Sequence, residues 1–346
     1  MVKSFNDQLL ECVAKGNINK ANFLLALKAD VNYVYNDCHL LCYANDDEMM
    51  DFLLKKGADI EFVNSKKETP LISAIANDKF DNAKRLIKFG ANVEACNSWK
   101  NSVLFLAIDK RDLELIKTIL KKKPNIEQKG DFERTALFYC ISHGFNFKDV
   151  AEHLIEAGAD VNAKDVFNSS CLLYACEYTD DLEGIKCLVE NGADINYCID
   201  EGINNPLVVA AQRNKWDIVK YLSEVGGDVN CPFYSGMRAL SYAVLDNNLE
   251  MVNFLISKGA LVNEVDNNGR GALWYACNSV FATDEIIKVL VSCGANPNML
   301  DNKGESPVMI ANRAEREVIF KTLKEVKAKK TFDNMGKVLN KIFGRN

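Results

Sequence analysis

Short clusters of apolar residues recur along the chain at the spacing of a helix face, separated by brief polar breaks. Residues 204–230 show the pattern clearly, with one cluster before the polar pair Asn214 and Lys215 and another after it. The first cluster is Leu207, Ala210 and Ala211, and the second is Trp216, Val219 and Leu222. Both follow a helical spacing rather than the alternation of a strand. This segment therefore predicts two short helices joined by a tight turn.

Special residues mark the ends of both expected helices. Asn205 is of a type favoured just before a helix, and Pro206 suits the first helical position, where its missing N–H costs nothing. Gly226 suits the left-handed conformation in which many helices end. The segment therefore has a defined start and a defined stop, after which the chain leaves the helical layer.

The same arrangement repeats through the sequence. The stretch EAGADVNAKD (residues 156–165) has close relatives, aligned on its glycine, at intervals of 29 to 35 residues. The aligned positions are 28, 57, 90, 123, 158, 192, 226, 259 and 294. One unit of this size cannot bury its own apolar face, so neighbouring units must stack into a continuous core. We therefore expect an all-α solenoid.

The repeat resembles that of the ankyrin family, whose pattern runs roughly T-P-L-H-x-A-A, a second helix and G-A-D-V-N. The segments ETPLISAIAND and ESPVMIANRA are similar to its first helix. The resemblance covers almost the whole chain and implies about ten helix–turn–helix units that alternate with β-hairpin fingers. We expect residues 1–35 to form an N-terminal capping repeat, 36–301 the central repeats, 302–330 a C-terminal capping repeat and 331–346 a basic amphipathic tail helix.

Two departures from the family pattern change these expectations. The family histidine is replaced by mostly apolar residues, which predicts apolar packing between repeats in place of a polar contact. The replacements are Ile72, Phe105, Phe138, Leu173, Val208, Ser241, Trp274 and Met309. In the fourth repeat Lys123 stands where glycine belongs, and lysine tolerates a positive φ poorly. Residues 121–130 are therefore the expected site of an irregularity or hinge.

Composition and targeting signals favour an intracellular protein. The chain is 48% hydrophobic and 26% charged, as soluble globular proteins are. Its first twenty residues lack the apolar run of a secretory signal, and no stretch approaches the roughly 20 apolar residues that span a bilayer. Twelve cysteines are present without a CxxC pair. We expect free thiols in a reducing compartment, the cytoplasm.

Residues that could carry chemistry are few. Cys38, His39 and Cys42 form a cluster with ligand-like residues, but a tetrahedral zinc site would need a fourth ligand from elsewhere. We expect His143 in an inter-helix loop and His153 on a solvated helix face. Neither has the sequence context of a nucleophile elbow, a phosphate loop or paired metal ligands. The sequence therefore predicts a non-enzymatic protein without a metal or cofactor.

Tyrosine is frequent at one position of the later repeats. In ankyrin proteins the variable residue after the family histidine faces the concave groove, so the resemblance places the equivalent residues there. The candidate groove contacts are Tyr139, Tyr174, Tyr242 and Tyr275. Tyrosine offers a large amphipathic surface and is enriched in binding hot spots. The alternative is that these side chains fill local space beside the fingers.

Further aromatic residues recur just beyond the G-A-D-V-N segments, on or near the expected fingers. The candidate finger contacts are Tyr35, Phe62, Trp99, Phe132, Phe167, Tyr197 and Tyr234. We expect some of them to be exposed for partner binding and others to pack beneath the fingers.

The end of the chain differs in charge from the rest. Residues 316–346 contain nine basic and three acidic residues, a net charge of +6, whereas the whole chain carries −6 and the remainder therefore −12. One helix face of this segment is apolar, formed by Met335, Val338, Leu339, Ile342 and Phe343. A basic amphipathic helix suits two roles, covering the last repeat or lying on an acidic membrane surface.

These features predict a monomeric protein-interaction module, an adaptor, scaffold or inhibitor that holds a protein partner in its concave groove. Nucleic acid is not expected as a partner, because a surface that follows phosphates must be basic and the repeats are acidic. The alternative function is a membrane-surface-associated regulator or host-directed effector that uses the basic tail.

Overall fold

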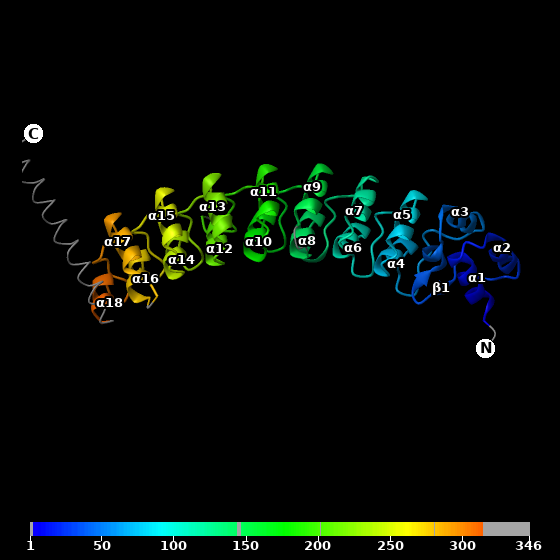
Figure 1. The fold of residues 1–346 in the computed structure, drawn as a ribbon, viewed down its shortest axis with the longest axis horizontal. Helices are drawn as coiled ribbons and strands as arrows, with labels where there is room; N and C mark the ends of the chain where they lie inside the picture. Colours follow the sequence, from blue (N-terminus) through cyan, green and yellow to red (C-terminus); the bar gives the residue numbers. More distant parts are fainter. Residues whose placement is uncertain (1–2, 144–146, 201, 280, 314–346) are drawn as a thin grey trace, which may run out of the picture. The chain divides into compact units, whose positions relative to one another are not determined.

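The computed structural model describes residues 3–143, 147–200, 202–279 and 281–313, and within them the all-α repeat fold is confirmed (Figure 1). Its α-helices are α1 (Phe5–Ala14), α2 (Ile18–Ala26), α3 (Asp47–Lys55), α4 (Pro70–Ala76), α5 (Phe80–Lys88), α6 (Val103–Asp109), α7 (Leu113–Leu120), α8 (Ala136–His143), α9 (Lys148–Glu156), α10 (Cys171–Tyr178), α11 (Leu182–Glu190), α12 (Pro206–Gln212), α13 (Trp216–Glu224), α14 (Ala239–Leu245), α15 (Leu249–Ser257), α16 (Ala272–Asn278), α17 (Asp284–Ser292) and α18 (Pro307–Arg313). The other elements are the strands β1 (Val34–Tyr35) and β2 (Cys38–His39) and the 3₁₀ helices η1 (Leu40–Tyr43) and η2 (Asp131–Glu133).

The chain divides into two compact units. The first is formed by residues 1–171 and 183–193, the second by residues 172–182 and 194–346. In the first unit α4 packs on α5, α6 on α7 and α8 on α9, while α4, α6 and α8 pack in succession, as do α5, α7 and α9. In the second unit the pairs are α12 with α13, α14 with α15 and α16 with α17, and α18 packs on α16. Each unit therefore contains two layers of stacked helices, as the repeat pattern predicts.

Capping residues define where these helices begin and end. Asn205 precedes α12, and its Oδ1 accepts the N–H of Val208 at 2.8 Å, with Pro206 at the first helical position as predicted. Ser102 caps α6 in the same way. After α13, Gly226 has a φ of 102°, the left-handed conformation expected from the sequence.

Lys123 takes the backbone conformation that glycine has in other repeats. Its φ is 54°, and its N–H bonds to the carbonyl three residues earlier at 2.9 Å, as the N–H of Gly90 does at 3.2 Å. This helix end is therefore regular in its hydrogen bonding, although the conformation is unfavourable for a residue with a Cβ atom. A second non-glycine residue with a positive φ lies in η2, where Phe132 has a φ of 57°. A hinge in residues 121–130 stays a prediction.

The core is apolar where the family pattern has histidine. Phe105 and Phe138 are fully buried at this position, and so is Val208. Met309, in α18, is exposed at the same position. The predicted replacement of a polar contact by apolar packing therefore holds through the central repeats.

The fingers contain less strand than the family resemblance implies. β1 and β2 pair as an antiparallel hairpin, with Val34 opposite His39 and Tyr35 opposite Cys38. The other pairings in the described fingers are single bridges: Cys96 with Ser102, Lys164 with Ser170, Asp200 with Ile203, and Val265 with Gly271. The loops therefore depend on side-chain hydrogen bonds more than on a β-ladder.

Side chains of the D-V-N segments link each repeat to the next. In the second unit, Oδ1 of Asn196 accepts the N–H of Asp228 at 2.8 Å, and its Nδ2 donates to the carbonyl of Gly226 at 3.2 Å. In three repeats of the first unit glutamate takes this position, at residues 61, 94 and 127, and Oε1 of Glu94 accepts the N–H of Asn125 at 2.7 Å. The recurring stretch therefore holds adjacent repeats together in addition to ending a helix.

The expected domain boundaries stay predictions. The N-terminal pair α1 and α2 falls within residues 1–35, and α18 is the last element that the structure describes. The tail at residues 331–346, with its alternative roles, lies outside the described residues. Within the part of the chain that the structure describes, no helix is long and apolar enough to cross a bilayer.

Candidate binding surface

A buried amide or carboxylate side chain fixes the tip of a finger. In the finger that precedes α6, Oδ1 of Asn97 accepts the N–H groups of Trp99 and Asn101, both at 3.0 Å. In the finger that precedes α10, Oδ1 of Asp165 accepts the N–H of Phe167 at 2.9 Å. Asn97 and Asp165 are buried, whereas the aromatic residue two positions later is exposed. The same turn therefore presents an aromatic side chain to solvent in both fingers.

The seven finger residues predicted from the sequence differ in exposure. The exposed fraction is 70% for Trp99, 63% for Phe167, 57% for Phe132 and 52% for Tyr234, while Tyr35 and Phe62 are also exposed and Tyr197 is half-buried. Leaving large apolar side chains in water forgoes roughly 1.5–3 kcal/mol each that burial would provide. Their recurrence on adjacent fingers is typical of a surface that is covered by a partner.

Phe132 and Phe167 come together on adjacent fingers. Their ring centroids lie 6.0 Å apart, and the carbonyl of Phe132 accepts the N–H of Val166 at 2.8 Å. The guanidinium of Arg134 lies 5.3 Å from the centroid of the Phe132 ring, and its Nη2 lies 3.3 Å from Oδ2 of Asp165. Phe132 is held at a positive φ, and such strained backbone clusters at functional sites. We call Phe132, Val166 and Phe167 the finger platform.

Tyr139 is the most buried of the four candidate groove tyrosines. Its hydroxyl donates to the carboxylate of Asp109, with both oxygens at 2.9 Å. Its ring packs edge-on against Phe105 and stacks on His143. Burial, reinforced by the bond to Asp109, raises the pKa of the Tyr139 hydroxyl well above its usual value. Most of this side chain therefore contacts other residues of the protein and is not available to a partner.

The candidate groove tyrosines of the second unit are half-buried. The hydroxyl of Tyr275 donates to Oδ2 of Asp266 at 2.6 Å, and Oδ1 of Asp266 accepts the backbone N–H groups that form the turn of its finger. Burial first, and then this bond, raise the pKa of Tyr275. Tyr242 packs edge-on against Phe233, with centroids 6.3 Å apart. These contacts match the alternative role of supporting the fingers.

Tyr178, an exposed residue beside Tyr174, was not among the candidates from the sequence. The centroids of the two rings lie 4.4 Å apart. The spacing of the two residues could have indicated it, because residues four apart lie on the same helix face and Tyr178 therefore neighbours the candidate Tyr174. Phe281 was also missed and is highly exposed. It lies in an insertion between two helices, where no repeat position defines its environment.

The candidate metal cluster is engaged within the fold. Nε2 of His39 lies 3.0 Å from the carbonyl of Glu68, and Sγ of Cys42 donates to the carbonyl of Pro70 at 3.2 Å. Burial lowers the pKa of His39 below its usual value. Among the described residues, no three His, Cys, Asp or Glu side chains are placed to hold a metal ion. All twelve cysteines are described, and all are free thiols.

The other two histidines lie on helices. The prediction that His143 belongs to an inter-helix loop was wrong, since it is the last residue of α8. Its ring stacks on Tyr139 one turn earlier, and its Nδ1 lies 3.1 Å from the Tyr139 carbonyl, so these contacts extend the helix. His153 lies on α9, partly exposed, with Nδ1 3.2 Å from Oε2 of Glu156.

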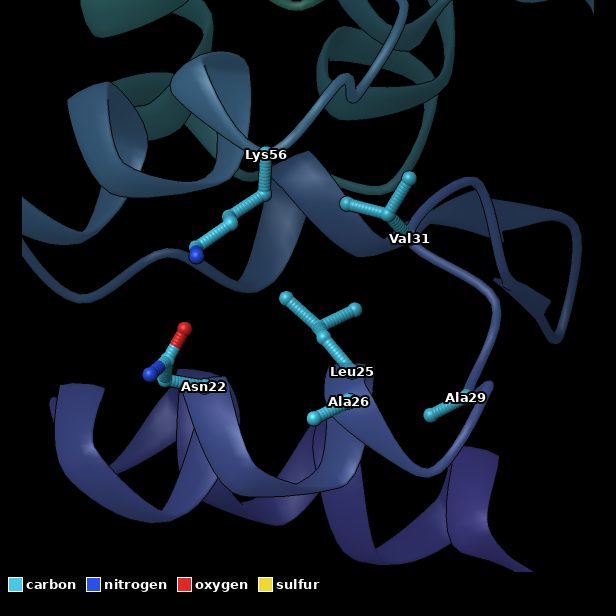
Figure 2. A pocket seen from close by; sticks show the side chains of 6 residues that line it. All are labelled: Asn22, Leu25, Ala26, Ala29, Val31 and Lys56. Carbon is cyan, nitrogen blue, oxygen red and sulfur yellow. The ribbon is translucent and has the colours of Figure 1, made fainter.

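A small concavity lies between α2 and Lys56, the residue that follows α3 (Figure 2). Its volume is about 310 Å³, and its lining residues are Asn22, Leu25, Ala26, Ala29, Val31 and Lys56. Figure 2 shows Leu25 projecting into it from α2, with the amine of Lys56 on the opposite side. Of these six residues Lys56 alone is ionisable, so the lining lacks the paired acid and base that proton-transfer catalysis needs.

Family models match ankyrin repeats along most of the chain. The model described as "Ankyrin repeats (3 copies)" matches residues 9–97, 38–129, 76–165 and 172–266. The model described as "Ankyrin repeat" matches residues 268–302.

Curated relatives share the same repeats over part of their length. The chain is 28% identical over 157 residues to the putative palmitoyltransferase ZDHHC13 of Danio rerio, which covers 45% of this chain and 24% of that protein. It is 29% identical over 167 residues to the B-cell lymphoma 3 protein homolog of Mus musculus, which covers 47% of this chain and 37% of that protein. The match therefore spans less than half the length of either relative.

Solved structures show the same fold. The ankyrin repeat domain of Bcl-3 aligns with a TM-score of 0.53 at 22% identity and covers 64% of this chain and 97% of that one. The human ASB11 ankyrin repeat domain aligns with a TM-score of 0.54 at 23% identity and covers 66% and 100%. Because the family models match well over half of the chain, the protein belongs to the ankyrin-repeat family.

Proposed function

We propose that this chain is a non-enzymatic protein-interaction module that acts in the cytoplasm as a monomer and binds a protein partner through its fingers and the adjoining concave groove. The observation that carries the proposal is the exposure of Trp99, Phe132 and Phe167 on successive fingers. Stacked repeats present extended surfaces of this kind to their partners.

The chemistry of the fingers suits protein binding. Aromatic anchors that become fully covered in an interface often contribute about 2 kcal/mol or more each. The finger platform is already ordered, because the N–H of Val166 bonds to the carbonyl of Phe132, Asp165 fixes the turn before Phe167, and the two rings lie 6.0 Å apart. These side chains therefore lose little conformational entropy when a partner binds, which favours affinity.

The groove tyrosines contribute unequally to the proposal. The hydroxyls of Tyr139 and Tyr275 already bond within the protein, so these two side chains mainly position the first helices and the fingers. Tyr174 lies beside the exposed Tyr178, so this pair offers the most accessible aromatic surface for the proposed groove contact. We assign the main contact to the fingers.

The proposal excludes an enzymatic role and a nucleic-acid partner. The palmitoyltransferase relative is matched over 24% of its length, so the match gives no support for assigning its named activity to this chain. The repeats carry a net negative charge, whereas a surface that follows phosphates must be basic. The membrane alternative depends on residues 331–346, outside the described residues, and the fingers are the better-supported contact surface.

Quantitative capture from a native lysate tests the proposal with three immobilised forms of the full chain. These are the wild type, a finger variant with Trp99→Ala, Phe132→Ala and Phe167→Ala, and a control with Phe23→Ala. Phe23 is an exposed aromatic on α2, whereas the three substituted residues belong to the fingers that precede α6, α8 and α10. We expect a set of proteins to bind the wild type and the control but not the finger variant, with unchanged circular dichroism. Equal capture by all three forms would place the interface elsewhere.

A further inference from the structure

Two cysteine side chains from adjacent fingers of the second unit lie in contact. Sγ of Cys198, in the finger that precedes α12, lies 4.0 Å from Sγ of Cys231, in the finger that precedes α14. Cys198 is partly exposed, whereas Cys231 is buried. A disulfide requires a sulfur–sulfur distance of about 2.05 Å. The two sulfur atoms therefore need to approach by about 2 Å, a movement that side-chain rotation and two loops can share.

The surrounding backbone keeps both thiols in this arrangement. Sγ of Cys198 donates to the carbonyl of Asn196 at 3.4 Å. Sγ of Cys231 accepts the N–H of Asn205 at 3.4 Å, and Asn205 is the N-cap of α12. A fixed helix end therefore holds Cys231 beside the finger that contains Cys198.

We propose that Cys198 and Cys231 form a reversible disulfide that joins two adjacent fingers. The pair lies 33 residues apart in sequence, one repeat period, so the bond connects equivalent loops of neighbouring repeats. Because both cysteines belong to the fingers rather than to the helical core, the cross-link leaves the helix pairs in place.

A low-molecular-weight disulfide such as oxidised glutathione supplies the oxidising equivalents. The thiolate of the partly exposed Cys198 attacks one sulfur of the reagent, forms a mixed disulfide and releases one reagent thiolate. Cys231 then gives its proton to water and attacks Sγ of Cys198, which releases the second reagent thiolate. Two cysteine thiols are oxidised and one small disulfide is reduced to two thiols. Burial raises the pKa of Cys231 to about 12, so the second step is slow at neutral pH and accelerates as pH rises.

The cross-link changes the surface that carries two candidate partner contacts. Tyr197 adjoins Cys198 in sequence, and Tyr234 lies three residues beyond Cys231. The fingers are already joined by the N–H of Tyr234, which donates to Oδ1 of Asn204 at 3.1 Å. Oxidation restricts the two loops further and so fixes the spacing of the two tyrosines. This consequence rests on the proposed function, whereas disulfide formation does not.

The first unit provides a matched control. Cys96 occupies the same position of its finger as Cys198, and its Sγ donates to a carbonyl two residues earlier at 3.5 Å. In the following finger Gln128 stands where the second unit has Cys231, and its Nε2 donates to Sγ of Cys96 at 3.0 Å. Cys96 therefore has a comparable position and exposure without a thiol partner in the next finger.

Peptide mapping tests the cross-link on the full chain. The reduced protein is incubated with oxidised glutathione at about pH 8, remaining thiols are alkylated under denaturing conditions, and digested peptides are sequenced by mass spectrometry. We expect a peptide that links Cys198 to Cys231, which dithiothreitol removes, while Cys96 carries only a glutathione adduct. Cys198→Ser should abolish the linked peptide, and Gln128→Cys should create a second one that includes Cys96. Closing a loop of this length is expected to raise the melting temperature by on the order of 5 °C or more.

Two outcomes would overturn the inference. The cross-link is excluded if Cys198 is recovered only as a glutathione adduct while Cys231 remains alkylatable. The regulatory consequence is excluded if the disulfide forms but oxidised and reduced chains capture the same proteins in equal amounts. The two proposals can fail separately. If the finger variant captures the same proteins as the wild type, the proposed function fails, but the peptide map can still show the disulfide.

Discussion

Asp165 and Arg134 face each other across two adjacent fingers, with Nη2 of Arg134 3.3 Å from Oδ2 of Asp165. The same carboxylate fixes its own finger, since its Oδ1 accepts the N–H of Phe167 at 2.9 Å. Arg134 in turn lies over the ring of Phe132. One buried acidic side chain therefore helps to position both rings of the finger platform.

We expect Asp165→Ala to lower the free energy of unfolding by roughly 2–4 kcal/mol, because it removes a buried acceptor of two backbone N–H groups and the carboxylate that faces Arg134. Asp165→Asn keeps the acceptor, and Asn97 fills the equivalent position naturally, so its cost should be about half as large. Urea unfolding followed by circular dichroism measures both. Equal losses for the two variants would show that the charge, and not the turn, is what matters.

The sequence predicted the helices well because each repeat carries its own start and stop signals. Asn205 and Pro206 begin α12, and Gly226 takes the left-handed conformation after α13, all as expected. These features are local, since a cap and a C-terminal glycine act within a few residues. Lys123 shows the limit of that reasoning, because the helix end keeps its geometry even without glycine.

The exposure of the candidate site could be predicted only in part. The spacing after the D-V-N segments located the finger aromatics, but the outward position of Trp99 depends on the acceptor atom of Asn97. The environment of Tyr139 depends on Asp109, which lies 30 residues earlier in the chain. Such contacts between repeats are set by how the units stack, which a single repeat pattern does not reveal.

Lys123→Gly should raise the free energy of unfolding by roughly 0.5–1 kcal/mol, because glycine adopts a positive φ without steric cost. Lys121→Gly is the matched control. Lys121 has a φ of −59°, so glycine there gains nothing and its greater freedom in the unfolded state should destabilise the protein. Urea midpoints of both variants decide the question. A loss of stability in Lys123→Gly would mean that the lysine side chain contributes more than its backbone strain costs.

Substitutions at Tyr139 and Tyr178 should differ in their effect on stability, because we expect Tyr139 to support the fold and Tyr178 to contact a partner. Tyr139→Ala is expected to cost about 3–5 kcal/mol of stability, as other truncations of buried aromatic residues do. Tyr139→Phe removes only the hydroxyl that bonds to Asp109 and should cost about 0.5–1.5 kcal/mol. Tyr178→Ala, at an exposed position, should change stability by less than about 0.5 kcal/mol.

Partner capture by Tyr139→Phe and Tyr178→Ala then tests the proposed groove contact. Reduced capture is expected for Tyr178→Ala, because it removes exposed aromatic surface beside Tyr174. Tyr139→Phe should capture as much as the wild type, since the ring remains in place. The reverse result would make the Tyr139 hydroxyl, rather than the exposed ring, the groove contact.

His39 should make stability depend on pH in the mildly acidic range. Burial lowers the pKa of His39 below its ordinary value of 6.5, even though the bond to the Glu68 carbonyl acts in the opposite direction. As pH falls below 6.5, the unfolded chain takes up a proton at this residue while the folded chain keeps it neutral. The stability contributed by the neutral ring is therefore present above the unfolded pKa and is lost as pH falls toward the folded pKa.

We expect the urea midpoint of the wild type to fall between about pH 7 and pH 5 because of this proton uptake. His39→Gln should flatten that slope, since glutamine can still donate to the Glu68 carbonyl but does not titrate. The control is His153→Gln, which replaces a partly exposed histidine on α9 and should leave the slope in place. A His39→Gln variant with the full wild-type slope would assign the acid sensitivity to other groups, because a neutral amide at this position cannot bind the proton.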